Sequence, residues 1–301
     1  MNTTPKASDA NAINRRYLDQ ILVEMRIIDS VKADTAFELF GKKFASPIMT
    51  PAFSHLHKIG EDGLTQMEEY AIAANELNFV NFVGMEPNDL FAKIMKLCPN
   101  TIRIIKPYAD PKLVYAELNQ AVELGALAVG MDIDHVFHGD GEYDVVDDIP
   151  MGPITKEQLK EYVDASNLPF VAKGVLSVAD AEKCRDAGCA AIIVSHHRGR
   201  VPFGVPPLMV LPKIKGAVGN DMKIFVDCGM NDGYDAFKAL ALGADAVCTG
   251  SVLLEPLNIN GAAGVKEKLE EENRQLMDLM EYTGAPTLKD ITGDVLYIPS
   301  F

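Results

Sequence analysis

Short apolar runs of strand length, rich in Val, Ile and Phe, recur along this chain and alternate with segments of helical periodicity. Continuous apolar strands between amphipathic helices predict a parallel sheet that is covered by helices. Eight such units in 301 residues fit an α/β fold of the closed (β/α)8 type, the TIM barrel, better than the alternative, an open doubly wound sheet. The predicted strands are 47–51, 79–84, 102–106, 127–132, 169–173, 190–195, 223–227 and 245–250, and the predicted helices are 63–75, 112–124, 156–165, 178–187, 208–218 and 233–242.

The ends of the chain and one long connection depart from this repeat. Residues 1–40 precede the first predicted strand, and we expect a helical extension that closes the bottom of the barrel or packs on its flank. Residues 264–280 have the pattern of a charged amphipathic helix. The connection 135–153 is rich in Gly, Pro and acidic residues without a helical or strand period, so we expect a lid-like loop, with a disordered acidic insert as the alternative. Nothing indicates a domain boundary within residues 1–301, which predicts a single domain.

The charge balance limits the partners of the protein. Its 28 Lys and Arg residues stand against 43 Asp and Glu residues, a net charge of −15, and this opposes binding to nucleic acid or to an anionic membrane. No apolar stretch approaches the roughly 20 residues that span a bilayer, and residues 1–14 lack the apolar core of a secretory signal. The five cysteines have no metal-binding spacing. We therefore expect a cytoplasmic protein without a metal site and with reduced thiols.

Polar and charged residues gather where the predicted strands end. The segment 132–134 (Asp-Ile-Asp) ends the fourth strand, Lys173 ends the fifth, and the run 196–200 (His-His-Arg-Gly-Arg) follows the sixth. In a (β/α) barrel these C-terminal ends meet at the rim where active sites lie. A neutral histidine suits proton abstraction from a hydroxyl, an arginine suits a carboxylate, and an aspartate can orient a histidine. Since successive residues point to opposite sides, we expect one of His196 and His197 to face the pocket.

Two glycine-bearing turns indicate a phosphate site. Residues 227–233 (Asp-Cys-Gly-Met-Asn-Asp-Gly) follow the seventh predicted strand and precede a helix, and residues 249–251 (Thr-Gly-Ser) follow the eighth. Backbone N–H groups in such turns, supported by a helix N-terminus, can bind an anion. In (β/α) barrels the loops after strands seven and eight often form the phosphate site. The pair of turns therefore predicts a phosphorylated ligand or cofactor.

These segments together resemble one enzyme family. The run 192–200 (Ile-Ile-Val-Ser-His-His-Arg-Gly-Arg) is similar to the Ser-Asn-His-Gly-Gly-Arg motif of the α-hydroxy-acid oxidases and dehydrogenases that depend on flavin mononucleotide (FMN), the group of glycolate and lactate oxidases. Residues 173–181 resemble the family's lysine-strand block, residues 226–244 its Asp-Gly-Gly-Val-Arg block, and residues 46–52 and 105–110 match more loosely. The resemblance implies FMN as cofactor, a 2-hydroxy acid or related hydroxy compound oxidised to the 2-oxo product, and a homotetramer or larger assembly.

The resemblance also implies roles for single residues. His197 would take the substrate hydroxyl proton while hydride passes to flavin N5, with Asp134 as its partner. Arg200 would hold the substrate carboxylate, Lys173 would lie near flavin N1, and Lys106 stands where the family has a substrate-binding tyrosine. The residues expected at the cofactor are Thr50, Pro51, Ala52, Gly84, Asp132, Lys173, Ser195, Asp227, Gly229, Gly250 and Ser251.

Several positions depart from the family pattern. Asn231 and Ser251 stand in place of the two phosphate-binding arginines, and within the histidine motif His196 replaces Asn and Arg198 replaces Gly. The family's second substrate arginine falls in a segment without Arg. We therefore expect a substrate other than plain lactate or glycolate. Two alternatives follow from the altered positions: a non-redox isomerase that resembles type 2 isopentenyl diphosphate isomerase, and a non-catalytic flavin-binding protein.

Overall fold

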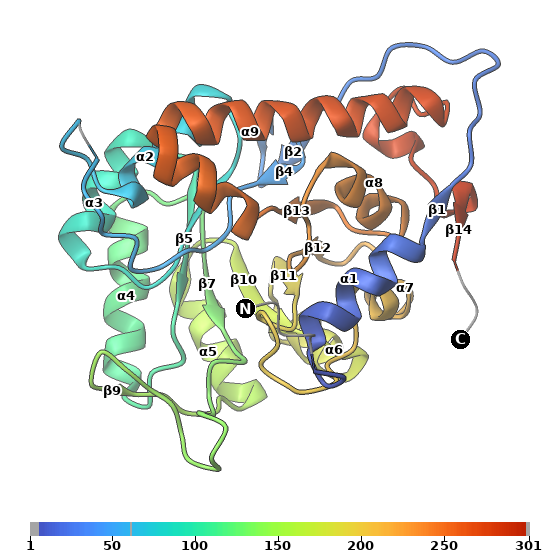
Figure 1. Ribbon diagram of the computed structural model, residues 1–301. Coiled ribbons are helices and arrows are strands. Elements are labelled where there is room, and N and C mark those ends of the chain that lie inside the picture. The colour runs from blue at the N-terminus through green and yellow to red at the C-terminus, as the bar shows by residue number, and fades with distance from the viewer. Residues whose placement is uncertain (1–5, 61, 299–301) are drawn as a thin grey trace.

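The computed structural model describes residues 6–60 and 62–298, and these form the predicted (β/α)8 barrel (Figure 1). Eight parallel strands lie side by side, and each falls within or next to a strand predicted from the apolar runs. The predicted domain limits at residues 1 and 301 lie outside the described residues. In spatial order the strands are β4 (Ile48–Met49), β13 (Ala246–Cys248), β12 (Lys223–Val226), β11 (Ala191–Val194), β10 (Phe170–Val175), β7 (Ala128–Asp132), β6 (Thr101–Ile105) and β5 (Asn81–Val83).

Thr50 connects the first and last strands of this order, β4 and β5. Its backbone N–H donates to the carbonyl of Val80 at 3.2 Å, and its Oγ1 accepts a bond from the N–H of Phe82 at 2.9 Å. The same hydroxyl donates to Asn81 Oδ1 at 2.7 Å, and the Thr50 side chain is fully buried. Because β4 is only two residues long, these side-chain bonds complete the seam of the barrel.

Helices cover the outside of the barrel, and local capping signals explain where several of them begin. Thr65 and Glu68 form a reciprocal capping box at the start of α2. The last helix, α9, begins earlier than the predicted 264–280 because it continues across a kink at Asn260 and Gly261, where Gly261 has a φ of +52°. The helices that follow barrel strands are α2 (Gln66–Glu76), α3 (Asn88–Leu97), α4 (Pro111–Glu123), α5 (Lys156–Ser166), α6 (Val178–Ala187), α7 (Pro207–Val218), α8 (Gly233–Ala241) and α9 (Leu254–Tyr282), with the short 3₁₀ helix η1 (Ser251–Leu253) before α9.

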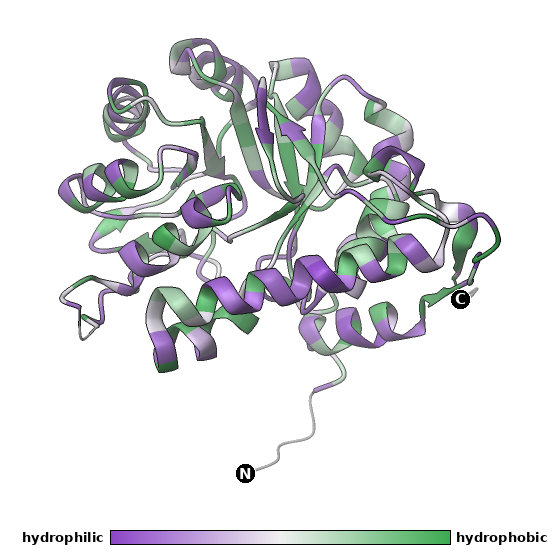
Figure 2. Cartoon of the chain, turned by 90° about the horizontal axis from the view of Figure 1, so that it is seen from above, coloured by the Kyte–Doolittle hydropathy of each residue, from purple (hydrophilic) through white to green (hydrophobic). Residues whose placement is uncertain are grey.

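Apolar residues pack inside the barrel and also between its strands and the surrounding helices. Figure 2 shows predominantly hydrophobic strands and helices in which hydrophobic and hydrophilic residues alternate. One cluster lies inside the barrel, where the rings of Phe82 and Phe225 meet edge to face at 6.3 Å. The hairpin of β2 (Phe37–Leu39) and β3 (Lys42–Phe44) adds Phe37, Leu39 and Phe44 to this cluster. The hairpin therefore closes the end of the barrel at which the strands begin.

The N-terminal helix α1 (Ala10–Gln20) lies at the opposite end, which differs from the expected position at the bottom or flank. Asn11 Nδ2 donates to the carbonyl of Arg198, and Asn14 Nδ2 donates to the carbonyl of Cys228, both at 2.8 Å. These bonds fix α1 on the loops that follow β11 and β12. The chain then passes through β1 (Leu22–Val23), which pairs with β14 (Leu296–Tyr297) after the 3₁₀ helices η2 (Leu288–Asp290) and η3 (Gly293–Val295).

The connection 135–153 contains a short hairpin that its sequence did not indicate. Strands β8 (Val145–Val146) and β9 (Ile149–Pro150) pair in antiparallel fashion. The carbonyl of Pro150 accepts a bond from the N–H of Ala109, which joins the hairpin to the segment after β6. Among the described residues, no helix has the length and apolar character needed to cross a bilayer.

Candidate functional site

A cavity of about 720 Å³ opens at the C-terminal ends of the barrel strands. Its volume falls in the range of about 300–1,000 Å³ that is typical of small-molecule and cofactor sites. Ten residues predicted for the site line it: Pro51, Ala52, Lys106, Asp132, Lys173, His197, Asp227, Gly229, Gly250 and Ser251. Five other predicted residues are absent from its lining: Thr50, Gly84, Asp134, Ser195 and Arg200.

A buried carboxylate at the end of β7 holds two ammonium groups in the cavity. Asp132 Oδ2 accepts a bond from Lys106 Nζ, and Asp132 Oδ1 accepts one from Lys173 Nζ, both at 2.7 Å. The three side chains are almost fully buried. Burial alone would raise the pKa of Asp132, but Lys173 and Lys106 hold it well below its ordinary value. Burial alone would lower the pKa of Lys173, but Asp132 raises it above its ordinary value. Lys173 is therefore a fixed cation inside the cavity.

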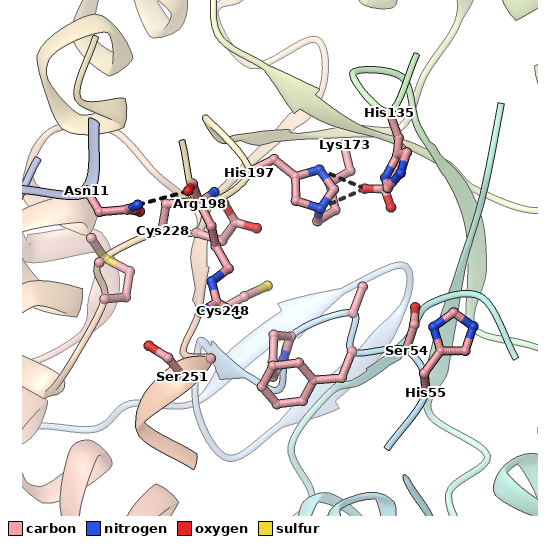
Figure 3. Close-up of a pocket in the computed structure, with 18 of the residues that line it drawn as sticks. Asn11, Ser54, His55, His135, Lys173, His197, Arg198, Cys228, Cys248 and Ser251 are labelled. Carbon is pink, nitrogen blue, oxygen red and sulfur yellow. Dashed lines mark hydrogen bonds and ion pairs between the residues drawn. The ribbon is translucent and has the colours of Figure 1, made fainter. Parts of the chain in front are cut away.

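His197 and Asp134 form a pair beside this group. His197 Nδ1 lies 3.0 Å from Asp134 Oδ1 and 3.1 Å from Oδ2, and it lies 3.9 Å from Asp132 Oδ1. Figure 3 shows the ring of His197 next to that of His135 in the cavity. A carboxylate at Nδ1 selects the tautomer with the proton on that atom. The other ring nitrogen, Nε2, is then unprotonated and can accept a proton.

Gly174 allows Asp134 to reach this position. Gly174 has a φ of +95°, and a Cβ atom there would lie 2.3 Å from the carboxyl carbon of Asp134. The register of β10 against β11 also shifts between Lys173 and Val175. A side chain at residue 174 would therefore both strain the backbone and displace the partner of His197.

His135 belongs to the same polar cluster but is held as a neutral ring. Its Nδ1 lies 3.1 Å from Lys106 Nζ, and its Nε2 lies 2.9 Å from Asp144 Oδ2. Burial, together with the positive charges of Lys106 and Arg200, lowers the pKa of His135 to about 4. One ligand atom each from Asp132, His135 and His197 lie within 4.8 Å of one another, as in a metal site. Both oxygens of Asp132 already accept bonds from ammonium groups, which opposes a cation there.

Arg200 is directed to the 135–153 loop. Its Nη1 donates to Asp144 Oδ2 at 3.1 Å and to the carbonyl of Phe137 at 3.2 Å. Burial opposes ionisation of Asp144, but the hydrogen bond from Arg200 and the positive charge of that guanidinium lower its pKa below the ordinary value. In this arrangement the guanidinium binds a carboxylate of the protein itself.

The turn after β12 presents an unsatisfied acceptor to the cavity. Within the described part of the chain, the buried Oδ1 of Asp227 has no hydrogen-bond partner. The next two residues, Cys228 and Gly229, have φ values of +66° and +81°. Burial raises the pKa of the Cys228 thiol to about 12, so it is protonated at neutral pH. The carboxylate of Asp227 can thus accept a hydrogen bond from a hydroxyl group of a ligand.

Three predicted residues support the cavity without lining it. Ser195 Oγ accepts a bond from the N–H of His197 at 3.0 Å and lies 3.3 Å from Cys228 Sγ, so it joins the loops after β11 and β12. Gly84 packs on the turn after β4, where a Cβ atom would lie 2.2 Å from Ser54 Oγ. Thr50 completes the seam of the barrel.

Helix α1 contributes two lining residues that the sequence did not predict, Asn11 and Arg15. Arg15 Nη1 donates to Asp235 Oδ2 at 2.6 Å and to the carbonyl of Gly229 at 3.1 Å. The helical pattern of this segment indicates a helix but not the loop on which it docks. Phe53, Ser54, His55, His135, Val146, Arg198, Cys228, Met230, Asn231 and Cys248 complete the lining.

Comparison with known proteins finds curated relatives that are named as oxidases of lactate or of 2-hydroxy acids. An L-lactate oxidase of Alicycliphilus denitrificans is 41% identical over 141 residues, which cover 46% of this chain and 39% of that protein. An L-lactate oxidase of a Roseobacter species is 37% identical over 52% of this chain and 43% of that protein. These two alignments span about two fifths of the relatives' length. A peroxisomal (S)-2-hydroxyacid oxidase of Arabidopsis thaliana is 26% identical over 95% of this chain and 88% of its own length.

Solved structures share the fold. A mandelate oxidase with benzoyl-formic acid has a TM-score of 0.86 and 24% identity, covering 97% of this chain and 90% of that one. A mandelate oxidase variant with an FMN adduct has a TM-score of 0.85 and the same identity, covering 98% and 93%. These similarities confirm the TIM barrel.

The family match extends along almost the whole sequence. The family described as FMN-dependent dehydrogenase matches residues 3–157 and 144–298. This confirms the predicted family of FMN-dependent oxidoreductases and the cofactor that defines it. The chain belongs to the FMN-dependent dehydrogenase family.

Proposed function

We propose that this protein oxidises a 2-hydroxy acid, or a related hydroxy compound, to the 2-oxo product with FMN as the electron acceptor. The observation that carries the proposal is the His197–Asp134 pair, at 3.0 Å, beside a buried lysine in a cavity of cofactor size. The names of the relatives, L-lactate oxidase and (S)-2-hydroxyacid oxidase, support this class of reaction.

The residues of the cavity fit FMN. The unsatisfied Oδ1 of Asp227 suits a ribityl hydroxyl, and the fixed cation of Lys173 suits negative charge on a reduced flavin ring. Pro51 and Ala52 would lie against the ring, and the turns at Gly229 and at Gly250–Ser251 would lie at the phosphate. When bound, FMN supplies the acceptor for the hydride that leaves C2 of the substrate.

The chain's own groups handle the proton. His197 Nε2 accepts the hydroxyl proton as the C–O bond of the substrate becomes a carbonyl. Asp134 accepts the Nδ1–H bond throughout, so it holds the ring in place and stabilises the imidazolium that forms. Gly174 is the position that lets Asp134 take this role.

The carboxylate end of the substrate would meet an altered set of cations. Lys106 lines the cavity, whereas Arg200 is bound to Asp144. A substrate carboxylate would share Lys106 with Asp132, and it can use Arg200 only after Asp144 releases it. This arrangement supports a substrate other than plain lactate or glycolate.

The test is the visible absorption spectrum of FMN-loaded protein before and after anaerobic addition of 2-hydroxy acids with different side chains. Bleaching of the flavin by one acid is the expected result. A flavin spectrum that no acid bleaches contradicts the proposal. Turnover of an allylic diphosphate with reduced FMN, without net electron transfer, would instead establish the isomerase.

The cytoplasmic location, the assembly into a tetramer and the organisation as a single domain stay predictions.

A further inference from the structure

The cavity has neutral residues where the family places its two phosphate-binding arginines. Asn231 and Ser251 stand at those positions, and both line the cavity. Side chains already occupy some backbone donors of the first turn: the N–H of Asn231 donates to Asp235 Oδ2 at 3.2 Å, and the N–H of Gly233 donates to Gln275 Oε1 at 3.0 Å. Fewer backbone donors of this turn are therefore left for a dianionic phosphate, and a cation from elsewhere in the chain would strengthen its binding.

Arg15 lines the cavity, but its donors are already used. A guanidinium has five N–H donors. Those of Arg15 bind Asp235 through Nη1 and Nη2, Asp19 through Nε and Nη2, and the carbonyl of Gly229 through Nη1. The two carboxylates also cancel its charge. Arg15 therefore fixes α1 on the turn after β12 and is not the phosphate cation.

Arg198 is the remaining cation at this end. Among the described residues that line the cavity, it is the Arg or Lys residue whose charged group has no carboxylate partner. Its backbone is fixed on both sides, because its N–H donates to Cys228 Sγ at 3.4 Å and its carbonyl accepts a bond from Asn11 Nδ2 at 2.8 Å. Figure 3 shows the side chain directed into the cavity, on the side of Cys248 and Ser251.

The backbone at Arg198 indicates that the arginine is not there for local stability. Its φ is +59°, between His197 at +47° and Gly199 at +94°. Side chains other than glycine are uncommon at positive φ, and the family motif has glycine at this position. The sequence instead keeps a long cationic side chain in a conformation that glycine would adopt without strain.

We propose that Arg198 binds the phosphate group of FMN and replaces the two arginines that this chain lacks. The planar fork of a guanidinium matches two phosphate oxygens. The inference rests on FMN as the cofactor of the proposed function. It concerns binding alone, so its test needs no turnover and can succeed even where oxidation of a hydroxy acid is not found.

The experiment compares FMN with riboflavin, which has no phosphate. Apoprotein is titrated with each flavin, and quenching of flavin fluorescence gives both dissociation constants for the wild type, Arg198→Gly and Arg198→Lys. Arg16→Ala is the matched control, because Arg16 lies on the exposed side of α1, its loss changes the net charge equally, and alanine keeps the helix intact. Glycine suits the φ of residue 198, so Arg198→Gly should melt no lower than the wild type.

We expect Arg198→Gly to weaken FMN binding about 10- to 100-fold, the equivalent of one or two charge-assisted bonds, with riboflavin binding nearly unchanged. The FMN affinity of Arg198→Lys should fall between those of the wild type and Arg198→Gly, and that of Arg16→Ala should match the wild type. Equal weakening of both flavins would overturn the proposal. An unchanged FMN affinity of Arg198→Gly would also overturn the proposal. If only the KM for a hydroxy acid rose in that variant, Arg198 would instead bind the substrate carboxylate.

Discussion

Arg200 and Asp144 form an ion pair that joins the loop after β11 to the 135–153 loop, with Nη1 and Oδ2 3.1 Å apart. The same Asp144 oxygen lies 2.9 Å from His135 Nε2, and Arg200 also donates to the carbonyl of Phe137. The carboxylate of Asp144 thus binds the guanidinium of Arg200, to which the family resemblance assigns the substrate carboxylate. Substrate and Asp144 would compete for one cation.

Asp144→Asn should therefore lower the KM for the hydroxy acid. An amide keeps the shape of the side chain but binds a guanidinium more weakly, so Arg200 becomes available. A partly exposed ion pair contributes up to about 1 kcal/mol, and we expect KM to fall roughly fivefold with little change in kcat. Steady-state kinetics with the acid that bleaches the flavin measures both constants.

The control for this variant is Asp140→Asn. Asp140 lies in the same loop and bonds to the exposed His138, away from Arg200. Its replacement should leave KM unchanged. A KM that rises in Asp144→Asn would mean that the ion pair orders the loop for binding rather than competing with the substrate.

Asp134→Asn should slow flavin reduction while leaving FMN bound. The amide cannot stabilise the charged ring of His197, so the rate of reduction should fall by about 10²- to 10⁴-fold, the usual contribution of a general base. Stopped-flow absorbance under anaerobic conditions measures this rate. His197→Gln should lose a similar factor, and the double variant should lose little more than either single one, because the two residues act as a unit. Additive losses would contradict the pairing.

The repeating elements could be predicted from local patterns, and the His197–Asp134 pair could be predicted from the resemblance to the family. Apolar runs fix the eight strands, and parallel strands bring their C-terminal ends to one rim, which is where the structure has Asp134 and His197. The cations Lys106 and Lys173 also lie at this rim, because Lys106 follows β6 and Lys173 lies in the last half of β10, and both bind Asp132.

The parts that could not be predicted depend on contacts between distant segments. Helix α1 docks through Asn11, whose side chain bonds to a carbonyl 187 residues away. Arg200 has its partner, Asp144, in a loop without sequence periodicity. The seam bonds of Thr50 could not be predicted either, because they arise where β4 is too short to pair with β5 through backbone bonds alone.

Gly174→Ala should destabilise the protein by more than its backbone conformation alone explains. The left-handed conformation costs about 1–2 kcal/mol for a residue with a Cβ atom, and the 2.3 Å contact with Asp134 adds a steric cost of about 1–3 kcal/mol. Gly125→Ala isolates the first cost, because Gly125 has a φ of +68° with nothing near its missing Cβ atom. Urea unfolding should show the larger loss for Gly174→Ala. Equal losses would mean that Asp134 moves aside freely.

Glu272 should make stability depend on pH in the neutral range. This residue of α9 is fully buried, and burial raises its pKa from 4.5 to about 8. Between those two values the folded protein holds a proton that the unfolded chain has lost, so stability falls as pH rises, by at most about 1.4 kcal/mol per pH unit. Below pH 4.5 Glu272 is protonated in both the folded and the unfolded protein, so its contribution to stability no longer changes with pH. Above pH 8 it is ionised in both states, and the loss of stability is constant.

Glu272→Gln removes this titration while keeping the shape of the side chain. The unfolding free energy of the variant relative to the wild type should rise from pH 5 to pH 8 and then level off, as measured by urea unfolding at pH 5, 7 and 9. Glu271→Gln is the control, because Glu271 is exposed and bonds to Lys268 at the surface. A difference between Glu272→Gln and the wild type that is constant across this range would show that Glu272 is ionised, and therefore paired, in the folded protein.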